Sequence, residues 1–365
     1  MRILRVSQHL YPDVTGGMAY HVHAMSRDQA AMGHDVTVLT VRHDEDDQIR
    51  ESRGGYDVIR CEPVARPLGN AICPGLARHL NPWTDADVIH AHSHLYASTN
   101  FAAAVSRLSS IPLALTNHGL YSQSAPERLF RWYLRTAGRW TFNRAAVVFC
   151  YTGVDRERVR TLGVRSPVAV VQNGVDPERF TPTGPLSEAV TATGPVVAFV
   201  GRLVPGKRPE IAVEALGRIR ETHPNASLYV VGDGPRRDLM AQRADALGVD
   251  DGVEFLGEMP YDAMPDLYRS IDVLILPSRA EGLPRVVMEA LVSGVPVVAT
   301  ELEQLRAVEL DGLFRVIGSD PAEFGRMACT AMEVEPDVET AIAEFDWTRT
   351  VEQTTERLDD LAACD

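Results

Sequence analysis

The chain has 365 residues, 45% of them hydrophobic and 24% charged, which are ordinary values for a folded protein of about two domains. A disordered or fibrous chain is excluded, and the apolar runs stop far short of the ~20 residues that cross a bilayer. The net charge of −14 argues against general nucleic-acid binding, because the molecule as a whole repels phosphate backbones.

The cysteines and the first residues of the chain indicate the cellular compartment in which the protein is expected. The five cysteines contain no C-x-x-C pair, which argues against a disulfide framework and against a thiolate metal site. The first residues begin a strand-like run with charges in it and show no signal-peptide pattern. We therefore expect a cytoplasmic protein.

Short runs of Val, Ile and Leu alternate with helical patterns, which predicts βαβ units around parallel sheets. The first strand, residues 3–8, precedes a loop with Gly16 and Gly17, a helix to about Ala31 and a strand at 35–41. Further strands of this first series are expected at 87–92, 113–116, 146–151 and 168–172.

Residues 181–195 are small, polar and rich in Pro and Gly, which predicts a domain boundary. We expect residues 1–181 plus 346–365 to form one Rossmann-like domain and residues 182–345 to form a second. The strands of the second series are expected at 196–200, 227–231, 253–256, 273–276 and 295–299. Ligands of such sheets bind at the carboxyl ends of the strands, so a cleft between the two domains is expected there.

The loop 201–209 lies between a predicted strand and a predicted helix that begins near Glu210. It places Arg202 and Lys207 at a helix N-terminus, where backbone N–H groups and the helix dipole already favour an anion. Lys207 is the only lysine among 36 Lys and Arg residues. This pattern predicts a diphosphate site, and the alternative is an exposed basic loop.

Two carboxylates form the next pattern. Glu281 follows a strand, and Glu289 stands eight residues later, about two turns along a predicted helix. Gly282 permits a close approach of the backbone, so Glu281 is expected to meet the reacting part of a ligand and Glu289 its hydroxyl-rich remainder. The alternative is a pair of surface carboxylates on an amphipathic helix.

Two further motifs are weaker. Gly232 and Gly234 lack the third glycine of a dinucleotide fingerprint, because position 237 is arginine, and this disfavours a dehydrogenase. Asp85 and Asp87 resemble a metal-binding D-x-D, but they precede their strand and lie at the end away from the expected site. We expect neither a metal nor a cofactor.

His90, His92 and His94 alternate along a predicted strand. This spacing leaves a three-histidine metal site open, but we favour ordinary hydrogen-bonded histidines.

Residues 127–144 are locally basic in an acidic protein. The arginines follow spacings of three, four and four, typical of one helical face: Arg128, Arg131, Arg135 and Arg139. Most of the large apolar residues are expected opposite: Leu129, Trp132, Tyr133 and Trp140. A helix of this kind binds membrane surfaces or anionic acceptors. We favour the alternative, a domain helix that buries its aromatic residues and solvates its arginines.

In their order and spacing, these motifs resemble glycosyltransferase family 4, the retaining, metal-independent sugar-nucleotide transferases of the GT-B fold. The resemblance covers nearly the whole chain. It rests on Gly16 and Gly17, on residues 87–92, 117–119, 172–176 with Phe180, 201–207, 231–235 and 281–289, and on residues 345–347 before a last helix that returns to the first domain.

The resemblance implies a role for each motif. Arg202 and Lys207 would hold the donor diphosphate, Glu289 the ribose, and Glu281 the transferred sugar. His118 would lie beside the reacting carbon. The remaining donor-site residues by this resemblance are Gly16 and Gly17 near the phosphates, Leu256, Gly257 and Glu258 beside the base, and Gly201, Gly282, Leu283 and Pro284.

One segment departs from the family pattern. Where the family has a Gly-Gly pair and a Pro-Glu, this chain has Glu303, Gln304, Arg306 and Ala307. We expect a retaining transferase that moves a hexose from a nucleoside-diphosphate sugar to a lipid-linked, glycan or small-molecule acceptor. The alternatives are a catalytically idle nucleotide-sugar-binding subunit and a sugar-nucleotide epimerase of the same fold.

Overall fold

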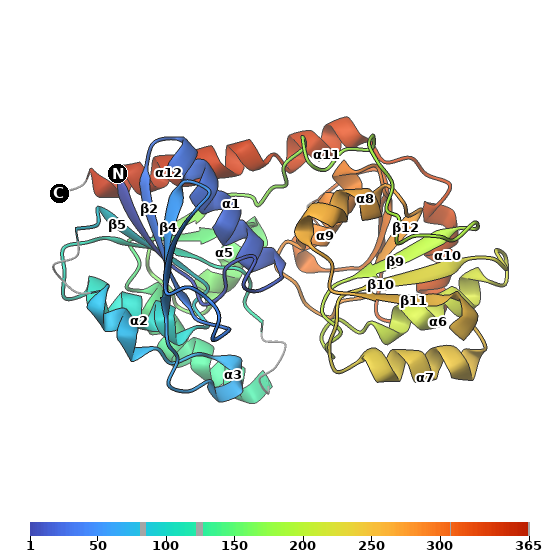
Figure 1. Ribbon diagram of the computed structural model, residues 1–365, viewed down its shortest axis with the longest axis horizontal. Coiled ribbons are helices and arrows are strands. Elements are labelled where there is room, and N and C mark those ends of the chain that lie inside the picture. Colours follow the sequence, from blue (N-terminus) through green and yellow to red (C-terminus); the bar gives the residue numbers. More distant parts are fainter. Residues whose placement is uncertain (81–84, 122–126, 307, 364–365) are drawn as a thin grey trace. The chain divides into compact units, whose positions relative to one another are not determined.

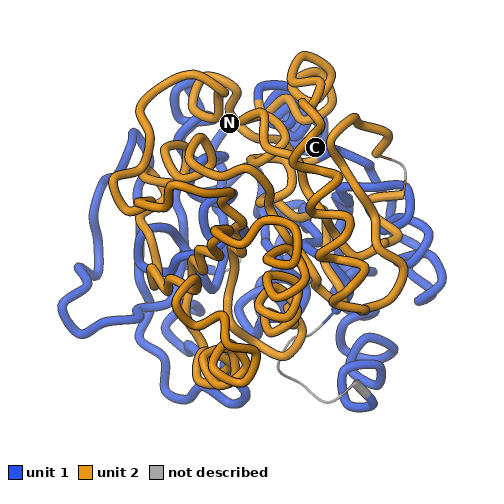
Figure 2. Tube along the Cα trace, turned by 90° about the vertical axis from the view of Figure 1, so that its right-hand side faces the viewer, with its two compact units in different colours: residues 1–172, 348–365 blue, residues 173–347 orange. Residues whose placement is uncertain are grey.

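The computed structural model describes residues 1–80, 85–121, 127–306 and 308–363 (Figure 1). Its contacts divide the chain into two compact units, coloured separately in Figure 2: unit 1 contains residues 1–172 and 348–365, and unit 2 contains residues 173–347. The division falls before the Pro- and Gly-rich stretch at 181–195, because Arg269 donates from Nε to the Pro185 carbonyl at 2.8 Å and holds that stretch on unit 2.

The strands of unit 1 form a sheet with the order β3-β4-β2-β1-β5-β6-β7-β8. Every pair is parallel except β3 with β4. The bounds are β1 Arg2–Val6, β2 Asp35–Val41, β3 Arg50–Arg53, β4 Tyr56–Cys61, β5 Val88–His92, β6 Leu113–Thr116, β7 Val147–Cys150 and β8 Val168–Val170.

Helices cover both faces of this sheet, because its strands are apolar on both sides. Val22 of α1 and Leu358 of α12 pack with Ile3 on one face, and Ala102 of α2 and Val159 of α5 lie in the cluster on the other. The bounds are α1 Gly17–Ala31, α2 Ala97–Ser106, α3 Glu127–Tyr133, α4 Arg139–Phe142, α5 Gly153–Thr161 and α12 Trp347–Ala362. The last helix therefore returns to unit 1 (Figure 1).

Two findings in unit 1 differ from the sequence predictions. The hairpin of β3 and β4 turns through Gly54 and Gly55, whose φ angles of 56° and 87° suit a tight two-residue turn that we did not predict. Residues 127–144 form α3, a π-helical turn over Leu134–Gly138, and α4, instead of one helix. The expectation that this segment buries its tryptophans is wrong, since Trp132 is 63% exposed and Trp140 is 39% exposed.

Unit 2 contains a fully parallel sheet with the order β11-β10-β9-β12-β13-β14. Its strands are β9 Val196–Val200, β10 Ser227–Val231, β11 Val253–Gly257, β12 Val273–Leu276, β13 Val297–Thr300 and β14 Leu313–Val316, of which β14 was not predicted. The strand order reverses between β9 and β12. In open α/β sheets the ligand crevice opens at the carboxyl ends of the strands at such a reversal.

The helices of unit 2 lie in two layers (Figure 1). One layer packs on Val197, Phe199 and neighbouring side chains and contains α6 Glu210–Ile219, α7 Arg237–Leu247 and α10 Pro321–Ala331. The other layer contains α8 Met264–Tyr268, α9 Arg285–Val292 and α11 Val338–Glu344. Nowhere in the described ranges is there a helix with the length and apolar character that a membrane span requires.

Candidate active site

Two loops meet where the strand order of unit 2 reverses. One follows β9 and includes Gly206 and Arg208, and the other follows β12. The backbone N–H of Arg279 donates to the Gly206 carbonyl at 2.9 Å. Arg208 donates from Nε to the Pro277 carbonyl at 2.6 Å and from a terminal nitrogen to Thr300 Oγ1 at 3.0 Å. These bonds fix the two loops against each other and against β13.

Lys207 and Glu281, one from each loop, form an ion pair with 2.5 Å between Nζ and Oε1. Their side chains are only 13% and 6% exposed. A Cβ placed on Gly201 would lie 3.7 Å from Cε of Lys207, so the lysine stem runs directly past this glycine. The structure thus brings together the residues predicted to contact the diphosphate and the sugar.

The glycines after β10 fit the β9 loop closely. A Cβ on Gly232, whose φ is +119°, would lie 2.2 Å from the Gly201 carbonyl oxygen, and one on Gly234 would lie 2.6 Å from that of Leu203. The N–H of Leu203 donates to the Asp233 carbonyl at 2.9 Å. These glycines let two backbones approach each other, which explains them without a dinucleotide fingerprint.

The N-terminus of α6 differs from the expected anion cradle. The N–H groups of Ile211 and Ala212 each donate at 3.1 Å to the carbonyls of Arg208 and Pro209, so they are used inside the first turn. Glu210 also stands in that turn. Positive charge at this end of the sheet therefore comes mainly from side chains, with Arg202 exposed on the same loop.

Glu289 lies on α9 and is 3% exposed. It accepts hydrogen bonds from the hydroxyls of Tyr261 at 2.7 Å and Tyr268 at 3.0 Å, and Nε of Arg285 lies 3.3 Å from it. Burial and the neighbouring Glu289 carboxylate raise the pKa of Tyr268. The alternative of two surface carboxylates is wrong, since Glu281 is also buried.

Arg285 was not predicted as a site residue. It donates to the hydroxyl of Tyr261 at 2.8 Å and to the carbonyl of Gly174 at 3.0 Å, and its guanidinium lies over the Trp347 ring at 5.8 Å. Its position four residues before Glu289 is a signal for a helical ion pair. The two tyrosines lie elsewhere in the sequence, and no spacing points to them.

The residues expected beside the nucleotide base, Leu256, Gly257 and Glu258, lie at the carboxyl end of β11 and directly after it. The Gly257 carbonyl accepts from the N–H of Gly232 at 2.7 Å, so this strand end lies next to the glycine loop of β10. Leu256 is partly buried and Glu258 is exposed. The remaining predicted donor-site residues, Gly282, Leu283 and Pro284, are buried in the turn that leads into α9.

His118 follows β6 in unit 1. Its Nδ1 lies 2.9 Å from the hydroxyl of Tyr151, and its Nε2 lies 3.0 Å from Nδ1 of His92. Burial lowers the pKa of His118 to about 3, so the imidazole is neutral near pH 7. Nε2 of His92 is buried and has no hydrogen-bond partner within the described structure.

The other residues of unit 1 that the sequence analysis singled out have structural contacts: hydrogen bonds, a helix N-terminus and ion pairs. Nε2 of His90 lies 2.8 Å from Oγ1 of Thr116, so His90 and His92 are hydrogen-bonded histidines, as favoured. His94 differs, because both of its ring nitrogens are buried and have no hydrogen-bond partner in the described ranges. Gly16, with φ of +152°, is the N-cap of α1, and Gly17 is its first residue. The D-x-D aspartates, Asp85 and Asp87, both pair with Arg2.

The sequence matches the models of two protein families. Residues 15–179 match Glycosyltransferase Family 4, and residues 187–323 match Glycosyl transferases group 1. A D-inositol 3-phosphate glycosyltransferase of Acidothermus cellulolyticus is 32% identical over an alignment of 384 positions, which covers 92% of this chain and 84% of that protein. The chain belongs to glycosyltransferase family 4. A glycogen synthase of Mycobacterium tuberculosis is 28% identical to this glycosyltransferase over an alignment of 390 positions, which covers 95% of the chain and 92% of the relative.

Solved structures share the fold of this glycosyltransferase. Sucrose-phosphate synthase from Thermosynechococcus elongatus has a TM-score of 0.78 at 20% identity, with 100% of each chain covered. Anabaena HepE in complex with UDP-glucose has a TM-score of 0.79 at 22% identity, with 99% of this chain and 100% of that one covered. The expected GT-B fold of two Rossmann-like units is confirmed.

The segment that departs from the family pattern follows β13. It forms a short 3-10 turn over Glu303–Leu305, in which Gln304 is buried. Nε of Arg306 lies 3.1 Å from Oε1 of Glu301. Ala307, the last residue of this departure, lies outside the described residues.

Proposed function

We propose that this glycosyltransferase retains configuration and moves a hexose from a nucleoside-diphosphate sugar to an acceptor bound mainly by unit 1. The observation that carries the proposal is the buried pair of Lys207 and Glu281 at the reversal point of the unit 2 sheet. A cation and an anion side by side suit a ligand whose phosphate and hydroxyl groups are neighbours.

The proposed chemistry follows from where charge develops. When the nucleoside diphosphate leaves, negative charge grows on its phosphate oxygens, and preorganised donors aimed at them stabilise the transition state. Arg202 and Lys207 would supply these donors. Glu281 would accept hydrogen bonds from the sugar, and the leaving phosphate would take the acceptor proton on the same face.

Glu289 would bind the donor ribose. An ionised carboxylate offers about four acceptor positions, and Tyr261, Tyr268 and Arg285 use three of them. The remaining capacity suits one ribose hydroxyl. His118 would act as a neutral imidazole, since its pKa lies well below 7.

Thermal-shift measurements with nucleoside diphosphates and their sugars test donor binding. A ligand at 100 times its Kd stabilises the fold by about 2.7 kcal/mol. Uridine nucleotides come first, because Anabaena HepE was solved with UDP-glucose. Slow donor hydrolysis without acceptor is expected of a transferase. Binding without hydrolysis would indicate the idle subunit, and a change of sugar configuration would indicate the epimerase.

Glu281→Ala is expected to lower kcat more than it raises the donor KM, because the proposed contact strengthens in the transition state. The matched control is Glu254→Gln, an exposed carboxylate on β11 of the same unit. Steady-state kinetics with the best donor measure both variants. Equal effects of Glu281→Ala on kcat and KM would contradict the role.

Turnover is expected to persist in EDTA, because Arg202 and Lys207 supply the positive charge that a metal would otherwise provide. The assay compares initial rates with EDTA and after addition of Mg²⁺ or Mn²⁺. Complete loss in EDTA with recovery on adding metal would refute metal independence.

A further inference from the structure

The outward side of residues 127–143 combines exposed arginines with exposed apolar side chains. Trp132, Leu129 and Trp140 are 63%, 47% and 39% exposed. Four exposed arginines lie on the same segment, and together these seven residues define the arginine face: Arg128, Leu129, Arg131, Trp132, Arg135, Arg139 and Trp140. Large apolar residues that a domain would ordinarily bury are thus held at the surface beside cations.

The segment that carries the arginine face is firmly attached to unit 1. Phe130, Leu134 and Phe142 are buried beneath it. The hydroxyl of Tyr133 lies 3.0 Å from Nδ2 of Asn100 on α2, and it donates to the His94 carbonyl. The apolar groups on the outer side are therefore presented by an anchored segment.

The charge of this region is opposite to that of the whole protein. Residues 127–166 contain nine arginines and three acidic residues, whereas the chain carries a net charge of −14. At physiological salt the Debye screening length is about 8 Å, so exposed charges farther apart than this interact weakly. A surface that meets the arginine face therefore experiences its positive charge, and the acidic remainder of the molecule is screened.

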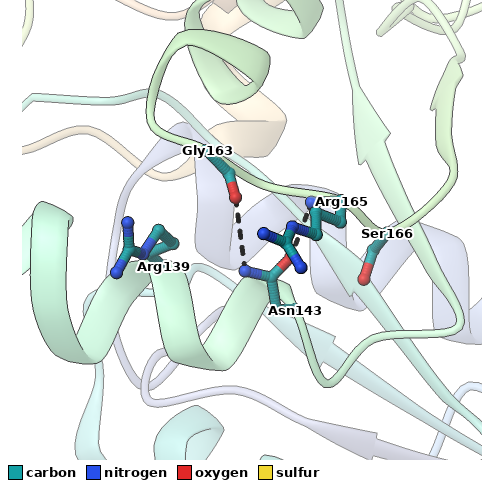
Figure 3. A pocket seen from close by; sticks show the side chains of 5 residues that line it. All are labelled: Arg139, Asn143, Gly163, Arg165 and Ser166. Carbon is teal, nitrogen blue, oxygen red and sulfur yellow. Dashed lines mark hydrogen bonds between the residues drawn. The ribbon is translucent and has the colours of Figure 1, made fainter.

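A cavity of about 550 Å³ lies at one end of the arginine face, lined by Arg139, Asn143, Gly163, Arg165 and Ser166 (Figure 3). Asn143 bridges its walls, accepting from the N–H of Arg165 at 2.6 Å and donating to the Gly163 carbonyl at 3.4 Å. Two arginines at one cavity suit a phosphate group. The lining residues precede β7 and β8, whereas His118 follows β6. The cavity therefore lies at the amino ends of the parallel strands, and His118 lies at their carboxyl ends.

We propose that the arginine face binds the surface of a bilayer that contains anionic phospholipids. The tryptophans and Leu129 would enter the interfacial region, where amphipathic aromatic rings are favoured. The arginines would pair with lipid phosphates. One headgroup would occupy the cavity between Arg139 and Arg165. This inference concerns unit 1 and does not depend on the donor chemistry.

The combination of residues favours a bilayer over other partners. A second copy of the chain would bring two arginine faces together, and their like charges would repel. A nucleic acid would pair with the arginines but leave the apolar side chains without a hydrocarbon environment. An anionic bilayer satisfies both kinds of residue at one surface.

Co-sedimentation of the full chain with vesicles tests this proposal. We expect binding to phosphatidylcholine vesicles that contain 30% phosphatidylglycerol, little binding to phosphatidylcholine alone, and weaker binding as salt rises. The variant Arg128→Gln/Arg131→Gln/Arg135→Gln/Arg139→Gln is expected to lower the partition coefficient at least about 100-fold. The double variant Trp132→Phe/Trp140→Phe should remove a blue shift of tryptophan emission on binding.

The matched control removes the same charge elsewhere. Its positions are arginines with side chains at least 55% exposed: Arg218, Arg243, Arg326 and Arg357. This control variant is expected to keep its binding. Thermal unfolding checks that both quadruple variants fold, and Arg165→Gln alone should weaken binding several-fold without altering the helical segment.

Four results would overturn the proposal: equal binding to vesicles with and without anionic lipid, retained binding by the folded quadruple variant, an equal loss in the control, or tighter binding of a mixed-sequence RNA than of the vesicles. Self-association through the arginine face, seen as a dimer that the quadruple variant abolishes, would equally refute it.

Discussion

The ammonium group of Lys207 is held in a narrow place, between Glu281 and the backbone of Gly201. A guanidinium is larger and planar, so it cannot occupy the same position with the same contacts. We expect Lys207→Arg to fold normally and to lose roughly 10²-fold or more in kcat, comparable to the loss of one oxyanion donor. Steady-state kinetics and circular dichroism measure the two parts of this prediction.

Lys207→Ala serves as the comparison and should be no less impaired than Lys207→Arg. Turnover near the wild-type level in Lys207→Arg would show that charge alone is sufficient. The single lysine of this arginine-rich chain would then be an accident of composition.

The contacts of Glu289 predict a cost in stability as well as in donor binding. Glu289→Ala removes the carboxylate that forms an ion pair with the buried Arg285. Loss of one member of a buried pair costs about 3–5 kcal/mol. We expect urea unfolding to show a loss of this size, together with a higher donor KM in the folded fraction.

The double variant Arg285→Met/Glu289→Leu separates the two effects. An apolar pair of similar volume should restore part of the stability, because no buried charge is left alone. Donor binding should stay weak. A Glu289→Ala protein as stable as the wild type would contradict the structural role of the carboxylate.

At the scale of elements, the chain that enters unit 2 lies against the segment that leads into α12. The N–H of Val175 donates to the Phe345 carbonyl at 2.9 Å. A Cβ on Gly174 would lie 2.6 Å from the backbone carbon of Asp346 and from the nitrogen of Trp347. No side chain of any size fits there without a shift of the backbone.

Gly174→Ala is therefore expected to destabilise unit 2 by about 1–3 kcal/mol, the usual cost of overpacking. Gly153→Ala is the matched control, because a Cβ there meets nothing within 4 Å and the residue begins α5. Urea unfolding compares the variants. Equal stability of Gly174→Ala and Gly153→Ala would show that the two segments separate readily.

At the scale of the whole molecule, histidines are concentrated in unit 1, which contains ten of the eleven. Burial lowers the pKa of His94 and His118 to about 3 and that of His90 and His92 well below the usual value. These groups stay neutral in the folded state when the unfolded chain, with histidine pKa near 6.5, takes up protons. The contribution of these histidines to the free energy of unfolding is therefore fully present above about pH 6.5 and is lost as the pH is lowered.

Each such histidine contributes a slope of up to about 1.4 kcal/mol per pH unit between pH 6.5 and its folded pKa. We expect hydrogen exchange at pH 5.5, corrected for intrinsic rates, to show larger opening in unit 1 than at pH 7.5. Unit 2, with His223 alone, is an internal control. Equal acid sensitivity of both units would exclude the buried histidines as the cause.

The sequence by itself determined the parallel strands at the centre of both sheets and the family. Strands buried on both faces are nearly continuous apolar runs, so β9, β10 and β12 were predicted with the bounds that the structure has. The loops that follow such strands share one sheet edge. For that reason Lys207 and Glu281 could be assigned to one site, although they lie 74 residues apart.

Tertiary structure alone decided the partners of those residues. Glu289 meets Tyr261 and Tyr268 because α8 and the turn before it pack beside α9, a neighbourhood that no spacing encodes. Trp132 and Trp140 are exposed to solvent because Phe130, Leu134 and Phe142 occupy the buried side of this segment. A periodic pattern tells which residues share a face, but the space left by neighbouring elements determines which face is covered.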